Sequence, residues 1–487
     1  MKIALIMPPM DSGEGRNSFF RVLHDFSKGK PHFNRIFKPL ISNKRLIDFE
    51  TYPYGLIQLS TQLTEKNHEV KIYNFLLEKT SINDIIKFYP DVIGFTCSIG
   101  GQLIWIDKVS RYLKKKLGSV IIFGGPHVTL SPKQTIRTTV ADYVLKGEAD
   151  YTFLNLLDFI QGKIDKLPKE GICYINKKKK IVNTPLVIIK NLDRLPIPDH
   201  SLINVKDYRT INLELSRGCN RKCPFCYISG FDGKNYWRPH SLNRKFKELK
   251  QIEDLVNIDD KRIRLLDLDF AADHSIVKNF CNYLIFNKFK SEFLADCVVY
   301  LNKDMLNKMD KAGFSQLSFG VETGSSILTK RFNKISKKKI IFDLYRNISK
   351  TNISPLSNII LMNPDETKLD ILNTLKMCRK LSEIPTYNPR TGSKGIFLTH
   401  LFRPYPKTQE YFSLINKGWC EPKSFQAWGK YFEEVSLGNF TNYNFTRGVS
   451  KSYLYKILFG FTKLNFNSFL LPRSRFLLKK INYRKVK

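Results

Sequence analysis

The sequence lacks the long apolar segments of membrane-spanning helices. None of its hydrophobic runs approaches the roughly 20 residues that cross a bilayer. The first residues, MKIALIMPPM, contain no basic leader followed by a full apolar stretch, so we expect a strand there and not a signal peptide. Both absences favour a cytoplasmic protein.

Cysteine is scarce and unevenly placed. The chain has 9 cysteines, an odd number with scattered spacing, which argues against a disulfide framework and suits a reducing compartment. Six of them have no mutual metal-ligand spacing. The remaining three, Cys219, Cys223 and Cys226, are close together and are the candidates for a metal site.

Acidic residues are also few, 44 against 80 Lys and Arg, which gives a formal net charge of +36. Because lysine is spread along the whole chain, a solvated surface accounts for most of this charge. The C-terminal segment 451–487 differs, since it contains no acidic residue and its basic residues alternate with Tyr, Leu, Ile and Phe. This mixture is typical of a segment on an anionic membrane surface, peripheral to the inner membrane face. A packed lid and contact with RNA are the alternatives.

The chain, 487 residues long, is expected to fold as two or three domains. Residues 1–165 alternate short apolar strands with helical patterns, which predicts an α/β domain with a doubly wound, Rossmann-like (flavodoxin-type) sheet. Its ligands would lie at the carboxyl ends of the strands. The segment from about Asp11 to Thr51 interrupts the alternation as an insertion. The expected strands are Lys2–Met7, Val70–Phe75, Asp91–Cys97, Ser119–Phe123 and Tyr143–Leu145.

A second alternating series follows a linker. Residues 166–208 combine a Lys run with the Pro-rich stretch LDRLPIPDH and are interpreted as that linker. Residues 209–410 contain six strand–helix units, which predicts a (β/α)6 partial barrel. Residues 411–487 are expected to be a helical, basic C-terminal region. The expected barrel strands are Ile211–Ser216, Arg262–Asp267, Ala295–Tyr300, Ser315–Val321, Ser357–Met362 and Gly395–Leu401.

The three clustered cysteines occur in the stretch LELSRGCNRKCPFCYIS, directly after an expected strand. Iron–sulfur clusters are held by thiolates, normally four. Three thiolates leave one iron with an open coordination position, at which a cluster can bind and reduce a substrate. A structural zinc site would require a fourth ligand, usually from a second cysteine pair, and no such pair follows. The spacing therefore predicts a 4Fe-4S cluster on Cys219, Cys223 and Cys226.

The motif resembles that of the radical S-adenosylmethionine superfamily, with aromatic Phe225 and Tyr227 around the last cysteine. Further segments agree in order, namely LLDLDF (265–270), FGVETGS (319–325), NIILMNPDET (358–367) and FRPYPKTQEY (402–411). Two departures occur: the third segment lacks the glycines that the family often has, and Lys407 replaces the usual glycine of the fourth. The resemblance covers roughly residues 192–415.

The resemblance implies roles for individual residues. Phe225 and Tyr227 would lie along the nucleoside of S-adenosylmethionine. Asp267 or Asp269 would bind the amino group of its methionyl part, and Glu322 would contact the same ligand. An ordinary carboxylate at a strand end is the alternative for each acidic residue.

The N-terminal half resembles that of the cobalamin-binding radical enzymes, through GGPHVT (124–129), the Gly-Glu pair at 147–148 and LPIPDH (195–200). The cobalamin signature Asp-x-His-x-x-Gly is absent, which implies that the cobalt lacks a lower histidine ligand from that motif. A domain that serves only as a scaffold is the alternative. The residues that the resemblance places near cobalamin are Thr96, Ser98, Gly124, Gly125, His127, Gly147 and Glu148.

The resemblance implies a radical enzyme that generates a 5′-deoxyadenosyl radical and methylates an unactivated carbon, for which a lipid or isoprenoid is one hypothesis. Its cofactors would be a 4Fe-4S cluster, S-adenosylmethionine and cobalamin, and a flavodoxin or ferredoxin would supply electrons. A radical cyclase or oxidative bond-forming enzyme of the same family, an RNA-modifying radical enzyme and a non-catalytic cobalamin sensor or carrier are the alternatives.

Overall fold

The computed structural model describes residues 1–9, 52–77, 80–231, 236–334, 338–389, 392, 394–436, 449, 453, 457–458, 460–461 and 464. The expected insertion at 11–51 lies outside the described residues, as does most of the basic segment 451–487. The chain divides into two compact units that do not follow sequence order. The first unit gathers Met1–Asn212, Cys226–Asn257 and Arg403–Asn439, and the second contains Leu213–Phe225, Ile258–Phe402 and the described part of Phe440–Lys487.

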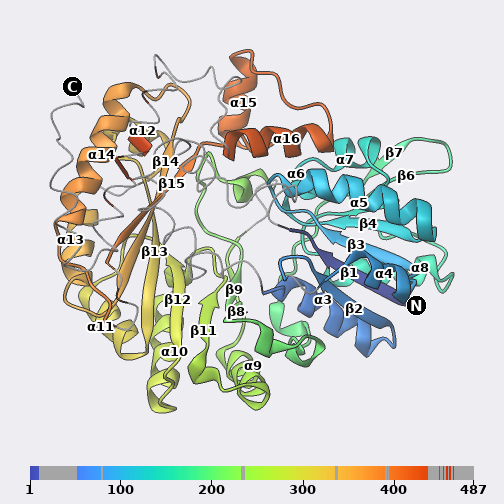
Figure 1. Ribbon diagram of the computed structural model, residues 1–487, viewed down its shortest axis with the longest axis horizontal. Coiled ribbons are helices and arrows are strands. Elements are labelled where there is room, and N and C mark those ends of the chain that lie inside the picture. The colour runs from blue at the N-terminus through green and yellow to red at the C-terminus, as the bar shows by residue number, and fades with distance from the viewer. Residues whose placement is uncertain are drawn as a thin grey trace, which may run out of the picture. The chain divides into compact units, whose positions relative to one another are not determined.

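The first unit is built on a mixed sheet of seven strands in the order β2-β1-β3-β4-β5-β6-β7 (Figure 1). The first five strands are parallel, and their order is that of a flavodoxin-like sheet with its switch point between β1 and β3. This confirms the Rossmann-like fold class. The strands are β1 (Lys2–Met7), β2 (Glu69–Asn74), β3 (Val92–Thr96), β4 (Val120–Gly124), β5 (Tyr143–Leu145), β6 (Ile172–Ile175) and β7 (Ile181–Asn183).

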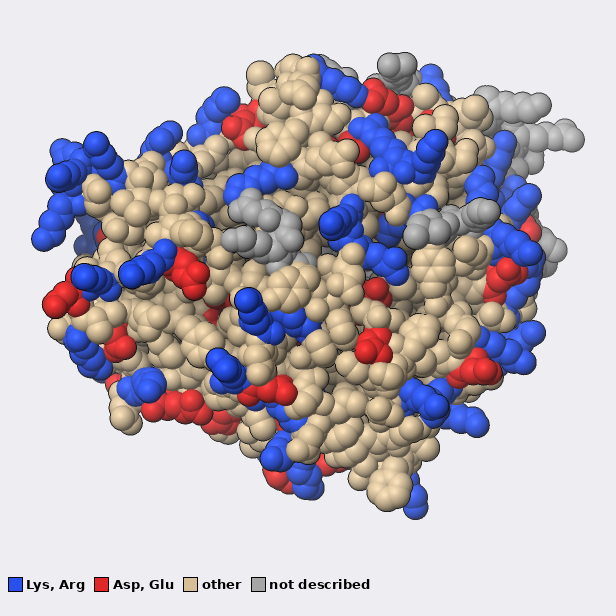
Figure 2. Space-filling model, turned by 180° about the vertical axis from the view of Figure 1, so that it is seen from behind, with Lys and Arg blue, Asp and Glu red and all other residues tan. Residues whose placement is uncertain are grey.

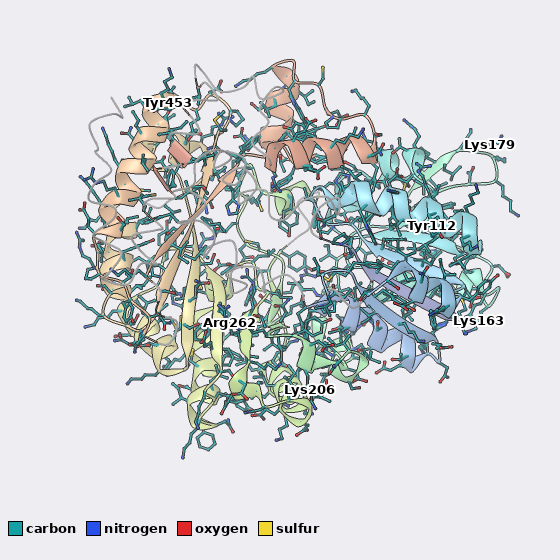
Figure 3. The ribbon with its side chains drawn as sticks, viewed as in Figure 1. Tyr112, Lys163, Lys179, Lys206, Arg262 and Tyr453 are labelled. Carbon is teal, nitrogen blue, oxygen red and sulfur yellow. The ribbon has the colours of Figure 1, made fainter. Side chains whose placement is uncertain are left out.

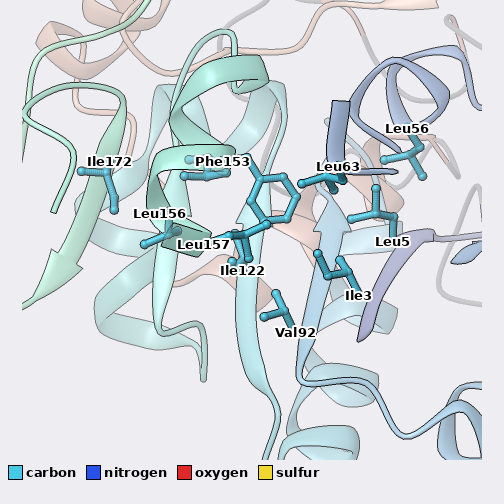
Figure 4. Packing of buried hydrophobic residues seen from close by; sticks show 11 residues of the cluster. Ile3, Leu5, Leu56, Leu63, Val92, Ile122, Phe153, Leu156, Leu157 and Ile172 are labelled. Carbon is cyan, nitrogen blue, oxygen red and sulfur yellow. The ribbon is translucent and has the colours of Figure 1, made fainter. Parts of the chain in front are cut away.

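Helices connect these strands and bury their apolar residues on the sheet. In one core cluster, Leu63 and Phe153 from two helices pack on Leu5 and Val92 from the sheet (Figure 4). The expected helix end at Gly118 is confirmed, because this glycine has φ of 72°, a left-handed conformation that suits a helix C-cap. The helices are α3 (Tyr54–Glu65), α4 (Ile82–Phe88), α5 (Gln102–Leu117), α6 (Pro126–Leu130), α7 (Pro132–Thr138) and α8 (Asp150–Ile160).

The segment 166–208 contributes more structure than the linker interpretation implied. Its strands β6 and β7 pair antiparallel with the sheet, and short 3-10 helices follow at Leu192–Arg194, His200–Leu202 and Val205–Asp207. The alternation of strands and helices along the sequence does not predict β6 and β7, because these two strands form a hairpin without an intervening helix. The exposed Lys179 lies in the turn of this hairpin (Figure 3).

The second unit contains most of a parallel six-stranded sheet with the order β15-β14-β13-β12-β11-β8. This confirms the expected partial barrel. One strand lies earlier than expected: the apolar residues Val298–Tyr300 follow β12 instead of belonging to it. The strands are β8 (Thr210–Leu213), β11 (Arg262–Leu265), β12 (Glu292–Cys297), β13 (Phe314–Glu322), β14 (Ser354–Leu361) and β15 (Ile396–Leu401).

Helices cover one face of this sheet, as Figure 1 shows for the yellow and orange segments. Phe280 packs edge-on against Phe293 of β12, and Tyr345 stacks on Phe397 of β15. These helices are α10 (His274–Phe286), α11 (Lys303–Lys311), α12 (Ser326–Arg331), α13 (Lys338–Ile348) and α14 (Lys368–Ser382).

Three helices from later in the sequence belong to the first unit, namely α9 (Leu242–Leu255), α15 (Gln409–Asn416) and α16 (Phe425–Ser436). Phe425 of α16 packs against Phe123 of β4, with ring centroids 5.5 Å apart. Gly429 lets α16 approach α5 closely, because an added Cβ would lie 2.9 Å from Ile104. The first unit is therefore completed by residues more than 200 positions away in sequence.

A buried polar network joins α9 to the segment 166–208 and to the start of α3. Lys245 donates to the Glu248 carboxylate at 2.8 Å, and Tyr54 donates to the same group at 2.9 Å. His200 Nε2 lies 3.2 Å from Glu248, while Tyr52 contacts the other ring nitrogen. The Lys245, Glu248 and His200 side chains are fully buried.

None of the helices that the structure describes has the length and hydropathy of a bilayer-spanning segment. On the face in Figure 2, basic side chains are distributed among neutral and acidic ones instead of forming one continuous stripe. This distribution suits the interpretation of the charge as a solvated surface.

Candidate active site

The three clustered cysteines lie on one loop between β9 (Ser216–Arg217) and a 3-10 helix at Tyr227–Gly230. All three side chains are partly exposed, whereas Cys97, Cys173, Cys281, Cys297 and Cys378 are buried. In the described ranges no three His, Cys, Asp or Glu side chains lie close enough to share one metal ion. The thiols nevertheless suit a 4Fe-4S cluster, in which each thiolate binds a different iron.

Asp267 fixes the start of the cysteine loop. Its carboxylate accepts hydrogen bonds from the Leu215 amide at 3.1 Å and from the Ser216 hydroxyl. The side chain is only 2% exposed, so both contacts are sheltered from water. This geometry gives Asp267 a positioning task, and of the two aspartates it leaves Asp269 as the better candidate for the amino group of S-adenosylmethionine.

Asp269 lies beside the same loop. Arg221, from the cysteine motif, approaches its carboxylate at 3.9 Å and also lies over the Tyr300 ring. The Val298 amide donates to Asp269 at 3.4 Å. Burial raises the pKa of Asp269, although Arg221 opposes this effect. A cationic amino group near this carboxylate would favour its charged form.

Glu322 ends β13 in a left-handed conformation, with φ of 62°. Lys334 pairs with its carboxylate at 3.1 Å, and the carboxylate lies directly over Gly320, where any Cβ would collide with it. Burial raises the pKa of Glu322, and Lys334 opposes the shift. A polar group held in a strained backbone at a strand end is typical of ligand-binding positions.

The two aromatic residues of the motif pack differently. Phe225 contacts Phe332 edge-on at 4.8 Å, within the second unit. Tyr227 contacts Phe231 and Tyr405 at 5.9 and 6.0 Å, within the first unit. Their predicted contact with the nucleoside remains a proposal.

The departures from the family's glycines have a structural counterpart. Met362, Asp365 and Lys407 have φ of 63°, 61° and 66°, the left-handed region in which glycine is favoured. These segments therefore adopt a backbone conformation that favours glycine without having glycine, at a cost of about 1 kcal/mol or more for each residue.

We expect Lys407→Gly to stabilise the protein by about 0.5 kcal/mol, because relief of the left-handed strain exceeds the added entropy of the unfolded chain. Lys423→Gly is the control, since Lys423 is an exposed loop residue without positive φ. This control should be destabilised by about 0.5 kcal/mol. Urea unfolding measures both changes, and equal effects of the two substitutions would contradict the explanation.

The residues predicted near cobalamin lie at the carboxyl ends of β3 and β4. Thr96 and Gly124 end these strands as direct register partners, and Ser98 is exposed just beyond. An added Cβ on Gly124 would meet no atom within 4 Å, so this strand end is open on one side. An open, hydroxyl-lined edge next to the switch point suits the tail of a large nucleotide-like cofactor.

Other members of the predicted set have partners within the protein. Gly125, with φ of 106°, leaves room for the Cys97 backbone, and Gly147 leaves room for the Val187 carbonyl. Arg238 binds both oxygens of Glu148, at 2.7 and 3.0 Å, and the Ile189 amide donates to the same carboxylate. Glu148 therefore ties β5 to the segment that follows the hairpin.

His127 lies inside a box of aromatic rings. Phe425, Trp428 and Phe432 of α16 surround it with centroid distances of 5.4 to 6.4 Å, and the side chain is 1% exposed. Neither ring nitrogen has a hydrogen-bond partner among the described residues. Burial lowers the pKa of His127 to about 3, so the ring is neutral at physiological pH. The ring has the surroundings of a packing residue.

Comparison with known protein families finds a match for one segment in each part of the chain. Residues 45–157 match the B12 binding domain, and residues 213–378 match the radical SAM superfamily, where SAM denotes S-adenosylmethionine. The protein is a radical SAM enzyme with a B12-binding domain. The resemblance inferred from the sequence is thereby confirmed, and the two families imply a 4Fe-4S cluster, S-adenosylmethionine and cobalamin as its cofactors.

Curated relatives of this radical SAM enzyme include methyltransferases at low identity. Uncharacterized methyltransferase PH0819 of Pyrococcus horikoshii is 26% identical over 84% of this chain and 89% of its own length. Cytidylyl-2-hydroxyethylphosphonate methyltransferase of Streptomyces wedmorensis is 25% identical over 63% of this chain and 69% of its own. Hopanoid C-3 methylase of Methylococcus capsulatus is 21% identical, over 77% and 72%.

Solved structures share the fold over nearly the whole chain. The radical S-adenosylmethionine methyltransferase TsrM of Kitasatospora setae aligns with a TM-score of 0.68 and 12% identity, over 97% of this chain and 91% of that one. The cobalamin-dependent radical enzyme OxsB aligns with a TM-score of 0.60 and 18% identity, over 86% of this chain and 55% of that one. At these identities the likeness is one of fold.

Proposed function

We propose that the radical SAM enzyme is a cobalamin-dependent methyltransferase that acts on an unactivated carbon of a small organic substrate. The observation that carries this proposal is the presence in one chain of three partly exposed cysteines in Cys-x3-Cys-x2-Cys spacing and of a B12-binding domain. The methyltransferases among its relatives support it.

When bound, the cofactors would supply reductive cleavage of S-adenosylmethionine to a 5′-deoxyadenosyl radical and a carrier for the methyl group. The chain's own residues would hold and orient these groups. The cluster would be bound by the thiolates of Cys219, Cys223 and Cys226. S-adenosylmethionine would be bound by the carboxylates of Asp269 and Glu322. Thr96 and Ser98 would contact cobalamin in the B12-binding domain.

The names of the relatives do not indicate a single class of substrate. The names of the relatives include hopanoid C-3 methylase, cytidylyl-2-hydroxyethylphosphonate methyltransferase and tRNA-2-methylthio-N(6)-dimethylallyladenosine synthase. A lipid or isoprenoid substrate and an RNA substrate therefore both remain alternatives to a soluble metabolite.

Anaerobic reconstitution with iron, sulfide and cobalamin tests the proposal. We expect bound iron, sulfide and cobalamin, and both 5′-deoxyadenosine and S-adenosylhomocysteine as products, because a methyl transfer consumes one S-adenosylmethionine as methyl donor and a second as radical source. Mass spectrometry of both products is the measurement. Formation of 5′-deoxyadenosine alone, with no S-adenosylhomocysteine, would favour the cyclase or oxidative alternative instead.

A further inference from the structure

Among the residues that the structure describes, helices cover one face of the barrel sheet (Figure 1). The Tyr345 hydroxyl contacts Ser357 at 2.6 Å, and its ring stacks on Phe397, so these two residues mark the covered face. Successive side chains of a strand point to opposite faces. Asn358 and His400 therefore point to the opposite face of β14 and β15.

Polar side chains cross this second face of the sheet from strand to strand. Arg264 of β11 pairs with Asp296 of β12 at 2.8 Å, and Asp296 is the register partner of Ser318 on β13. Asn358 donates to the Ser318 hydroxyl at 2.9 Å, and its carbonyl lies 3.1 Å from His400 Nε2. We call these five residues on five adjacent strands, Arg264, Asp296, Ser318, Asn358 and His400, the polar diagonal.

The polar diagonal is accessible to solvent. The Arg264 and Asp296 side chains are 26% and 34% exposed, His400 is exposed, and the other two members are half-buried. On the covered face, by contrast, Ser357 and Phe397 are buried. An accessible polar surface on the inner face of a partial barrel occupies the position in which barrel enzymes bind their ligands.

The diagonal also lies next to a predicted contact of S-adenosylmethionine. Gly320 is the register partner of Asn358, and the Glu322 carboxylate lies directly over Gly320. A molecule seated on Asn358 and His400 would therefore neighbour Glu322 and Lys334. This arrangement suits a substrate that must receive a radical from a ligand bound at Glu322.

The chemistry of the diagonal specifies the class of molecule that it can bind. The members of the diagonal pair with one another, but polar atoms with remaining hydrogen-bonding capacity, such as the second N–H of the Asn358 amide, would lose water to an apolar ligand without replacement, at about 1–3 kcal/mol for each such atom. The charge of Arg264 is matched by Asp296, so no excess charge on this pair selects an ionic ligand. Leu356, Ile360 and Leu398 lie on the same face, half-buried or exposed, and could contact apolar parts of the ligand.

We propose that the polar diagonal is the substrate-recognition surface and that it binds a water-soluble molecule through neutral hydrogen-bonding groups, such as hydroxyls or amides, near the reacting carbon. This inference rests on the proposed function for the identity of the reaction. It disfavours the lipid and isoprenoid version of that function, because such a substrate would offer no hydrogen bonds to the remaining donors and acceptors of the diagonal.

The test uses the reconstituted full chain with S-adenosylmethionine that carries a deuterated methyl group. Methanol–water and chloroform extracts of cells of the source organism are the two acceptor probes. Asn358→Ala and His400→Ala are compared with the wild type and with Thr399→Val, which changes the other face of the same strand. Three quantities are measured: affinity for S-adenosylmethionine, 5′-deoxyadenosine formed with and without each extract, and label transferred to products.

We expect only the methanol–water extract to stimulate 5′-deoxyadenosine formation in the wild type and in Thr399→Val. In each diagonal variant this stimulation should be about tenfold smaller, which corresponds to the loss of one hydrogen bond. The affinity for S-adenosylmethionine and the extract-independent 5′-deoxyadenosine should stay within about twofold. Label in a water-soluble product should fall in parallel.

Stimulation by the chloroform extract, or by neither extract, would overturn the inference. So would a parallel loss of S-adenosylmethionine affinity in the diagonal variants, because the diagonal would then hold that ligand and not the substrate. If the methanol–water extract stimulates 5′-deoxyadenosine but no label is transferred, methylation fails while the inference about substrate recognition stands.

Discussion

Cys223→Ala is expected to reduce 5′-deoxyadenosine formation to the level of a reaction without enzyme. The substitution removes one of three thiolates, and of the cysteines outside the motif all but Cys420 are buried. Two thiolates do not retain a cluster that requires three protein ligands. Iron and sulfide content after anaerobic reconstitution should fall together with product formation.

Cys420→Ala is the matched control, because Cys420 is a free, exposed cysteine outside the motif. It should keep the iron content and the product yield of the wild type. The thermal unfolding of the two apoproteins should be equal, since Cys223 is only partly buried. Unchanged 5′-deoxyadenosine formation in Cys223→Ala would refute the radical reaction and would revive the interpretation as a cobalamin carrier.

Lys245→Met is expected to destabilise the first unit by about 3 kcal/mol, the second large effect. The substitution removes the amine from a fully buried pair and leaves the Glu248 carboxylate in a site from which water is excluded. Tyr54 and His200 still contact the carboxylate, which limits the loss. Urea unfolding measures the change, and the exposed Lys250 of the same helix provides the control. Lys250→Met should change stability by less than about 0.5 kcal/mol.

The pH dependence of this network has a definite sign. Burial raises the pKa of Glu248, but Lys245 and His200 outweigh it and lower the pKa from 4.5 to about 2. A folded-state pKa below the unfolded value stabilises the protein above pH 4.5, and the contribution is lost as the pH falls toward 2. The stability difference between the wild type and Lys245→Met should therefore shrink as the pH decreases through this window. A constant difference down to pH 3 would contradict the assignment.

The sequence predicts the fold class well because strand and helix patterns are local. Apolar runs such as Val92–Thr96 and the helix end at Gly118 depend on neighbours along the chain. The cysteine motif is local for the same reason, since a single loop carries all three thiols. The placement of β12 was less accurate, because an apolar run alone does not say which of its residues pair with the neighbouring strand.

Contacts between distant segments could not be predicted in this way. Glu148 is recognisable as part of a motif, yet its partner Arg238 is 90 positions away and carries no motif of its own. His400 belongs to no recognisable motif, and only the register of β14 and β15 places it near Asn358. The aromatic box around His127 is likewise formed by α16, and nothing in the sequence of this helix predicts that it packs against His127.

The composition of the first unit limits how this enzyme can be recombined with others. A cofactor-binding domain that ended near residue 208 would behave as an exchangeable cassette, to be joined to a different radical domain by evolution or in the laboratory. Here α9 supplies Lys245, Arg238 lies just before α9, and Phe425 of α16 packs beside Phe123. A chimera with its junction at residue 208 would take the sheet of the first unit from one parent. The helices α9 and α16, which pack with this unit, would come from the other parent and would not match it. We therefore expect functional chimeras only where the donor provides all three sequence segments together.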